Sequence, residues 1–254
     1  NQSLPFNPDP RPTNEILGHL PPRPRETRNL SLESLFASLK GKVIALDGVT
    51  GEGKSSQVEA LRKISERHGF AARTLPEFSD SEIGQKITEI VVRQRYFSLR
   101  PGGDCTVADT FAVFADLAYR SEVEKPFLPE AVTFADRGIL SNAAYQTVRL
   151  ARQPGWNTER AIEFVTSLVE TLSQSIQPPD VHLWLRIDPA ERTHRIELRE
   201  GQGVSVEEQA DFQRIESVME YFSQILPVVQ VDVSRLSPEE TSERILSVLS
   251  RHWQ

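Results

Sequence analysis

Residues 48–55 read GVTGEGKS, and this stretch decides the fold class of the chain. It fits the pattern G-x-x-x-x-G-K-[ST], in which glycines let successive backbone N–H groups curl around a phosphate. In such a loop Lys54 reaches the β- and γ-phosphates of a nucleotide, and the Ser55 hydroxyl ligates Mg²⁺. The sequence therefore predicts a nucleotide-binding loop. Its expected ATP contacts are Gly48, Thr50, Gly51, Glu52, Gly53, Lys54, Ser55 and Ser56.

The segments on either side of this loop support the prediction. Lys42–Asp47 (KVIALD) is an apolar run rich in β-branched residues, typical of a buried parallel strand. Ser55–Gly69 carries Val58, Leu61 and Ile64 at helical spacing and closes with a glycine. A strand, a glycine loop and a helix in this order place a helix N-terminus under the phosphates. An ordinary glycine-rich turn is the alternative interpretation.

Length and composition set broad limits. A chain of 254 residues can bury a large core as one domain or as a domain plus a tail. The net charge of −7 argues against binding nucleic acid through bulk positive charge. A single cysteine, Cys105, excludes an intramolecular disulfide and fits a reducing, cytoplasmic compartment. No run of eighteen apolar residues and no secretory leader is visible, so we expect no membrane partner.

The N-terminal segment differs from the rest of the chain. Seven of the 17 prolines fall within the first 24 positions, a composition that disfavours helices and central strands. We therefore predict a proline-rich extension at residues 1–40 and one folded domain at 41–254. The extension is either a partner-binding arm or a tail without catalytic chemistry. Within it, Ser31–Leu39 predicts a short amphipathic helix that leads into the first strand.

From Lys42 onward, strand-like and helix-like stretches alternate. This alternation predicts a three-layer α/β fold, a five-stranded parallel sheet flanked by helices. The expected strands are Val43–Asp47, Ala71–Leu75, Ala131–Asp136, Val181–Ile187 and Pro227–Val233. Further helices are expected from a capping box at Thr106–Asp109, from Asn157 or Thr158 to about Ile176, along the stripe Phe212, Ile215, Met219 and Phe222, and from the capping box Ser237–Glu240 to about His252.

A second landmark is the strand that ends in Asp136 and Arg137 (VTFADR, residues 132–137). A carboxylate at the end of a strand beside the phosphate loop is the expected second magnesium anchor, so Ser55 and Asp136 form the predicted metal pair. The guanidinium of Arg137 suits bidentate phosphate binding. A surface ion pair is the alternative interpretation.

A third landmark is a cationic stripe. Arg192, Arg195 and Arg199 follow a helix start at Asp188-Pro189, and their spacings of three and four put them on one helical face. Such arginines neutralise charge on a transferring phosphoryl group. They are equally compatible with a solvated face on which arginines pair with Glu191, Glu197 and Glu200. Gly201-Gln-Gly203 follows and predicts a hinge for a lid.

Taken in order, five stretches carry a family resemblance. They are DGVTGEGKSSQ (47–57), LPEFSDSEIGQKI (75–87), PFL (126–128), DRGILSNAAYQ (136–146) and PDVHLWLRIDPAERTHRIELR (179–199). With them the chain from about Gly41 to Trp253 resembles thymidylate kinases, which are phosphate-loop nucleoside-monophosphate kinases. The resemblance implies a P-loop NTPase fold with an arginine-bearing lid. It also implies ATP and Mg²⁺ as cofactors, phosphorylation of a dTMP-like pyrimidine nucleoside monophosphate to the diphosphate, and a homodimer.

The resemblance also implies roles for individual residues. Arg137 would bind the acceptor monophosphate, Asn142 would contact the pyrimidine, and Tyr145 would pack near C2′ of the sugar and disfavour ribose. Because the phosphate loop carries no arginine, Arg195 and Arg199 of the lid would supply the catalytic cations. The expected catalytic set is Lys54, Arg137, Arg195 and Arg199, with Arg192 among the ATP contacts. The expected acceptor contacts are Glu77, Phe78, Phe114, Asp116, Arg120, Arg137, Asn142 and Tyr145.

Three departures from the family pattern concern the acceptor. Thr50 stands where the family has an acidic residue on the sugar 3′-hydroxyl, and Phe78 stands where it has an arginine for the acceptor phosphate. The family also has an arginine that contacts thymine O4. Its position falls near Asp116 or Leu117 in this sequence, and Arg120 lies one turn later. We hypothesise that Asp116 prefers a base with an exocyclic amine, as in cytosine; in the alternative, Arg120 donates instead and thymine is still bound.

Two other functions are compatible with these residues. A kinase for a nucleoside or another small acceptor would share the fold and explain the missing acceptor-phosphate arginine. A nucleotide-binding regulator without turnover, with the proline-rich segment docking a partner, is a different class. Products formed from nucleoside and nucleotide panels distinguish the three.

Overall fold

The computed structural model describes residues 31–93 and 106–253. The proline-rich residues 1–30 and Cys105 lie outside the described residues. A five-stranded sheet forms the centre of the domain, with the strand order β2-β3-β1-β4-β5 and every pairing parallel. Its strands are β1 (Val43–Asp47), β2 (Ala71–Leu75), β3 (Ala131–Asp136), β4 (Val181–Arg186) and β5 (Val228–Asp232). The predicted α/β fold class and all five predicted strands are confirmed, with ends that agree to within one residue.

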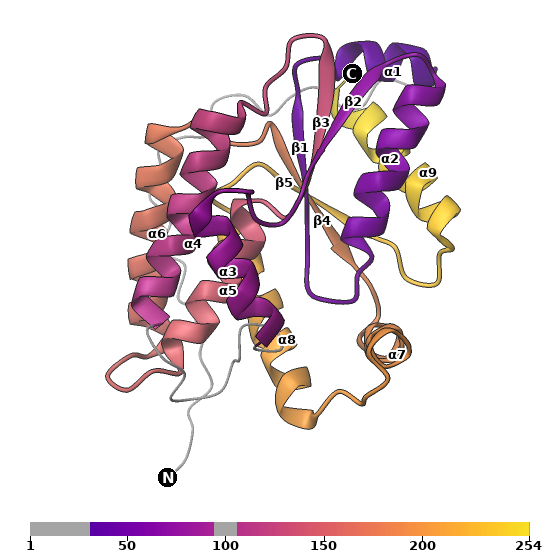
Figure 1. The fold of residues 1–254 in the computed structure, drawn as a ribbon. Coiled ribbons are helices and arrows are strands. Elements are labelled where there is room, and N and C mark those ends of the chain that lie inside the picture. The colour runs from indigo at the N-terminus through magenta and orange to yellow at the C-terminus, as the bar shows by residue number, and fades with distance from the viewer. Residues whose placement is uncertain (1–30, 94–105, 254) are drawn as a thin grey trace, which may run out of the picture.

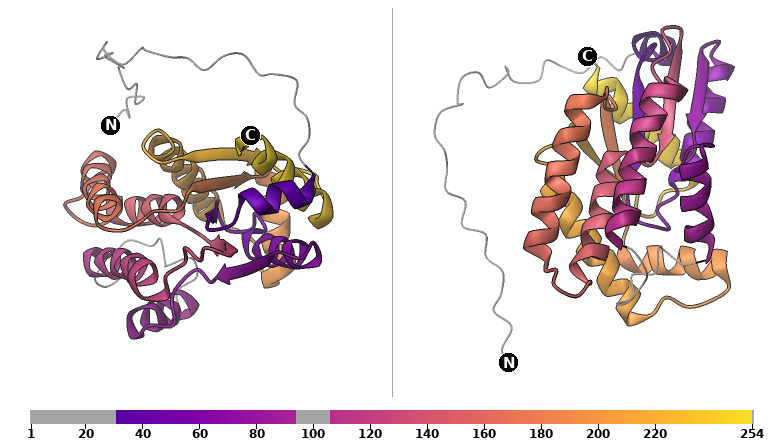
Figure 2. Two further views of the ribbon diagram at one scale, coloured as in Figure 1. Left: turned by 90° about the horizontal axis from the view of Figure 1, so that it is seen from above. Right: turned by 60° about the vertical axis from the view of Figure 1, so that its left-hand side comes forward.

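Helices cover both faces of this sheet (Figure 1). One face carries α1 (Leu32–Ser38), α2 (Lys54–Arg67) and α9 (Pro238–His252). The other carries α4 (Thr106–Tyr119), α5 (Ile139–Ala151), α6 (Thr158–Ser175) and α8 (Val206–Phe222), with α3 (Glu82–Arg93) against α4. Helix α7 (Pro189–Glu200) belongs to neither layer and lies beyond the carboxyl end of the sheet, as Figure 1 and the right-hand view of Figure 2 show.

The position of β1 explains where the site forms. β1 pairs with β3 on one side and β4 on the other, and Leu46 is in register with Asp136 and Leu183. The loops that follow β1 and β3 therefore leave the sheet side by side at its carboxyl edge. In open α/β sheets ligands bind at this edge.

Capping residues fix several predicted helix starts. Ser31 accepts from the Ser34 N–H at 3.3 Å, and Asn157 accepts from the Arg160 N–H at 2.8 Å. The capping box formed by Ser237 and Glu240 has both of its hydrogen bonds. The helix predicted to open at Thr106 is confirmed as α4, in which Asp109 forms an ion pair with Arg149 at 2.8 Å; the capping box itself stays a prediction.

Two helices, α3 and α5, were not predicted from the sequence. Every residue of α5 from Ile139 to Leu150 is buried, so this helix has no polar stripe by which periodicity could reveal it. Helix α3 carries Gly84 in its first turn, a residue that disfavours helices. Gly84 fits there because a Cβ would come within 2.2 Å of the Ser79 carbonyl oxygen.

Helix α1 is integrated into the domain. Leu35, Phe36 and Leu39 are each no more than 1% exposed and join the same apolar cluster as β1, α2 and α9. The predicted boundary between residues 40 and 41 stays a prediction. These contacts nevertheless show that the folded unit includes a helix assigned to the extension.

Candidate active site

The loop after β1 has the backbone conformation of a phosphate cradle. Gly48, Gly51 and Gly53 adopt φ values of 145°, 92° and 82°, which L side chains rarely reach. A Cβ at Gly48 would lie 2.0 Å from Glu52 Oε2, and one at Gly51 would lie 2.8 Å from Cγ1 of Ile196. The loop therefore turns back on itself and leads directly into α2 at Lys54.

The side chain of Lys54 lies over this cradle. Its Nζ donates to the Val49 carbonyl at 2.7 Å, and the side chain is largely buried. Burial, together with the nearby charge of Arg137, lowers the pKa of Lys54 to about 8. The ammonium is thus still charged at neutral pH and stands where anionic phosphates would stabilise it further.

Ser55 and Asp136 meet, as the predicted metal pair requires. The Ser55 hydroxyl donates to Oδ2 of Asp136, across the gap between α2 and the end of β3. A hydroxyl and a carboxylate are oxygen donors of the kind that Mg²⁺ prefers. The residues present therefore fit a magnesium ion.

Arg137 adopts an unusual backbone conformation at the end of β3. Its φ is 65°, in the left-handed region where non-glycine residues are uncommon. The guanidinium donates to the Gly48 carbonyl at 2.7 Å, forms an ion pair with Glu77 at 2.8 Å and lies 4.8 Å above the Tyr145 ring. Arg137 thus connects the phosphate loop to the loop that follows β2.

A buried carboxylate beneath the loop joins three elements. Oδ1 of Asp47, at the end of β1, accepts from the N–H groups of Gly138 and Ser141 at 2.9 and 2.8 Å, capping α5. Its Oδ2 contacts Nδ1 of His182 at 2.7 Å. Burial opposes the charge of Asp47, but His182 and these hydrogen bonds outweigh it and lower the pKa to about 2. Ser141 in turn accepts from the Gly48 N–H at 3.0 Å.

The phosphate loop, Asp136, Arg137 and the end of α7 surround a cavity of about 680 Å³ at the carboxyl edge of the sheet. Its lining residues are Thr50, Gly51, Gly53, Lys54, Ser55, Ser56, Glu77, Val91, Asp136, Arg137, Arg199, Glu200 and Gln202. Most were predicted, but Val91, Glu200 and Gln202 were not. The last two lie beyond the arginine stripe, where spacing alone does not show how the chain turns. Cationic and anionic side chains therefore line the same cavity.

The three arginines of α7 have different environments. Arg199 lines the cavity and pairs with Glu200 at 2.6 Å. Arg195 pairs with Glu191 at 2.5 Å, and its Nη1 lies 3.9 Å from the position of a Cβ at Gly53. Arg192 is only 2% exposed and does not line this cavity. Its guanidinium is paired with the buried Glu52 and the partly exposed Glu216, which argues against the predicted ATP contact.

Asp116 is engaged by its own chain and not turned toward a base. The carboxylate of this buried residue accepts from the Ser79 N–H at 3.1 Å and from the hydroxyls of Ser79 and Ser81. Arg120, one turn later, donates to the Glu77 carbonyl at 3.0 Å. Both predicted base contacts thus hold the loop between β2 and α3. The hypothesis that Asp116 selects an amine-bearing base stays a prediction, and these intramolecular donors argue against it.

The remaining predicted acceptor residues lie around this loop and α5. Phe78 is buried against Ile87 and Val113, and Phe114 belongs to the core under α5. Asn142 is 4% exposed, and its Nδ2 donates to the Gly138 carbonyl at 3.0 Å. The Tyr145 hydroxyl accepts from the Thr50 N–H at 3.0 Å and lies 3.2 Å from the Thr50 hydroxyl. None of these four lines the 680 Å³ cavity.

A family model described as thymidylate kinase matches residues 46–245, which is most of the chain. The chain belongs to the thymidylate kinase family. The match spans the phosphate loop, the Asp136-Arg137 turn and the arginines of α7. The resemblance carried by the five sequence stretches is thereby confirmed.

Individual thymidylate kinases are similar to the chain over different lengths. The enzyme of Dichelobacter nodosus is 40% identical over 58 residues, which is 23% of this chain and 29% of that protein. The one from Chlorobium luteolum is 29% identical over 150 residues (59% and 64%), and the one from Rickettsia typhi 25% over 210 residues (81% and 96%). The chain thus spans less than two thirds of the first two relatives.

A solved structure supports the fold. The thymidylate kinase of Candida albicans, whose report describes broad substrate specificity and a novel structural element, superposes with a TM-score of 0.63. It is 18% identical in sequence, and the superposition covers 84% of this chain and 92% of that one. At this identity the likeness concerns the fold. Among the described helices of this thymidylate kinase family member, none is long and apolar enough to cross a membrane.

Proposed function

We propose that this chain transfers the γ-phosphoryl group of ATP to the phosphate of a pyrimidine deoxynucleoside monophosphate, dTMP or a close relative. The single observation that carries the proposal is the cavity in which the phosphate loop, Asp136, Arg137 and Arg199 converge. Family membership supports the substrate class. Arg137 at the end of β3 would bind the acceptor phosphate, and the arginines of α7 would face the phosphoryl group that is transferred.

The proposed reaction needs no nucleophilic side chain. An oxygen of the acceptor phosphate attacks the γ-phosphorus in line, the bond from that phosphorus to the β,γ-bridging oxygen breaks, and ADP leaves. Lys54 and the loop amides would hold the donor phosphates, and Arg137 the acceptor phosphate. Arg195 and Arg199 would neutralise charge on the transferring group. Mg²⁺ held by Ser55 and Asp136 would neutralise the β- and γ-phosphates when bound.

The acceptor end favours a nucleotide over a nucleoside. Arg137 is presented to the cavity by Glu77, Gly48 and Tyr145, so a guanidinium is available without the arginine that Phe78 replaces. An acceptor phosphate would give this guanidinium a second anionic partner beside Glu77, which an acceptor without a phosphate would not. A homodimer remains part of the proposal, and light scattering on the full chain tests it.

The test is a product assay with ATP, Mg²⁺ and a panel of dTMP, dUMP, dCMP, CMP, UMP and thymidine, read by mass spectrometry. We expect dTDP, the diphosphate formed from dTMP, as the main product. Lys54→Ala should lower kcat/KM by about 100-fold or more, because it removes the ammonium over the phosphates. Exclusive phosphorylation of thymidine would favour the nucleoside kinase. Binding of ATP without any product would favour the regulator.

A further inference from the structure

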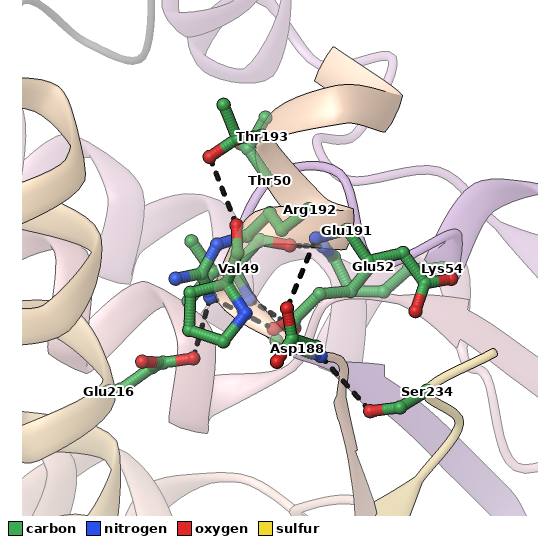
Figure 3. A network of polar contacts seen from close by, with 12 residues as sticks. Val49, Thr50, Glu52, Lys54, Asp188, Glu191, Arg192, Thr193, Glu216 and Ser234 are labelled. Atoms are coloured by element: carbon green, nitrogen blue, oxygen red, sulfur yellow. Dashed lines mark hydrogen bonds and ion pairs between the residues drawn. The ribbon is translucent and has the colours of Figure 1, made fainter. Parts of the chain in front are cut away.

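Three charged side chains from three elements meet behind the phosphate loop (Figure 3). Glu52 of the loop lies 3.4 Å from Nη1 of Arg192 in α7, and the same nitrogen lies 2.6 Å from Glu216 of α8. The side chains of Glu52 and Arg192 are 0% and 3% exposed. The other oxygen of Glu52 accepts from the Val49 N–H at 2.6 Å. One carboxylate therefore closes the phosphate loop and contacts the lid helix.

The charges in this cluster are not balanced. Two carboxylates share one guanidinium, and the other charged group that faces Glu52 is the ammonium of Lys54. Burial raises the pKa of Glu52 to about 7 in spite of Lys54 and Arg192. Keeping Glu52 ionised thus costs stability, and a buried ion pair is weak evidence for a role in stability. Costs of this kind are common where a residue serves function.

The same helix face makes the other contacts with the loop. Ile196 is fully buried, and its Cγ1 lies 2.8 Å from the position of a Cβ at Gly51, so α7 is seated directly on the loop. Arg195, one position before, lies beside Gly53. The start of α7 is held separately, since Glu191 accepts from the Arg235 N–H at 2.8 Å. Between these two contacts, and among the described residues, the ion pair of Arg192 with Glu52 is the polar interaction that joins α7 to the phosphate loop.

We propose that Glu52 and Arg192 are positioning residues that fix α7 against the phosphate loop, so that Arg195 and Arg199 face the transferring phosphoryl group. The inference rests on the proposed function for its kinetic consequence. It does not rest on it for the docking of α7. Neither residue would touch ATP; both would act through the arginines of α7.

Glu52→Gln tests the proposal, because the amide oxygen still accepts from Val49 while the charge toward Arg192 is lost. In the free protein, hydrogen exchange of residues 190–200 should become roughly fivefold faster, with α2 unchanged. For transfer, kcat should fall about 10- to 100-fold while KM for ATP stays within about threefold, since misplacing charge affects the transition state most. The melting temperature at pH 8 should not fall, because the remaining pair of Arg192 and Glu216 is balanced.

Two further variants complete the experiment. Arg192→Gln should give the same kcat loss and the same faster exchange, and combining both changes should lower kcat no further than either alone. Glu220→Gln is the matched control: it removes the charge of an exposed acid of α8 whose carboxylate accepts from the Gln230 side chain at 3.0 Å, and it should match the wild type. Wild-type exchange in α7 of Glu52→Gln, or a raised KM for ATP with unchanged kcat, would overturn the proposal. If the wild type transfers no phosphate to any acceptor, the proposed function fails, while the exchange data still decide the docking of α7.

Discussion

At the scale of single residues, the site depends on conformations and partners that the sequence pattern does not contain. Spacing predicted that Ser55 and Asp136 would meet, because they follow neighbouring parallel strands. No spacing rule predicts that Arg192 pairs with Glu216, since the two are on different helices. Likewise, no sequence pattern indicates the left-handed φ of Arg137 or the hydrogen bond from its guanidinium to the Gly48 carbonyl. Sequence patterns thus placed the candidate site at the carboxyl edge of the sheet. They did not predict how the cationic side chains of the site are oriented.

Asp47→Asn should destabilise the fold in a pH-dependent way. The pKa of Asp47 is lowered from 3.8 to about 2, so its stabilisation is complete above pH 4 and is lost as the pH falls toward 2. The size follows from the shift, about 2 kcal/mol in the free energy of unfolding at pH 7. Denaturant titrations from pH 7 to pH 3 measure the gap between variant and wild type, which should narrow below pH 4. The exposed Asp80→Asn is the control, and a gap that stays constant with pH would contradict the assignment.

At the scale of elements, helices α4 and α5 carry several of the residues proposed to form the acceptor side of the site. Helix α4 and the π-helical turn Arg120–Glu124 that follows it hold the loop after β2, through Asp116 and Arg120. Helix α5 begins on the Asp47 carboxylate. The sequence predicted α4 from its apolar stripe but missed α5, because burial on all sides removes amphipathic periodicity. It also could not show that Asp116 faces serines within the fold.

Asp116→Asn should loosen the loop after β2 without changing base preference. The amide can replace only one of the two acceptor oxygens that Ser79 and Ser81 use, which costs about 1–3 kcal/mol of stability. KM for the acceptor should rise, since this loop presents Glu77 to Arg137. Unfolding titrations and the acceptor panel measure both effects. An unchanged stability together with a switch between dTMP and dCMP would restore the base-reading role; the exposed Glu122→Gln serves as control.

At the scale of the whole molecule, a helix that composition assigned to the N-terminal extension packs against the phosphate-loop domain. The prolines of the first 24 positions led to a boundary at residue 40, yet Leu35, Phe36 and Leu39 are buried with α2 and α9. The composition of a segment shows which residues it contains, but it does not show where their apolar side chains pack. The fold class, by contrast, follows from the alternation of strand and helix patterns that begins at Lys42.

Phe36→Ala tests whether α1 belongs to the cooperative unit. Phe36 is 1% exposed, and removing a buried phenylalanine side chain costs about 3–5 kcal/mol. Equilibrium unfolding in urea measures the loss, with the exposed Ser34→Ala on the same helix as the matched variant. A free energy of unfolding within about 0.5 kcal/mol of the wild-type value would support the predicted boundary between residues 40 and 41.

The carboxylate of Asp47 anchors the first turn of α5, and the Ser141 in that turn holds the first glycine of the donor loop. Changes in α5 that are meant to alter the choice of acceptor will therefore also disturb the loop that we propose binds the triphosphate of ATP. Engineered variants selected for a new acceptor should carry altered affinity for ATP as a side effect. A screen that scores only the acceptor would overlook this loss.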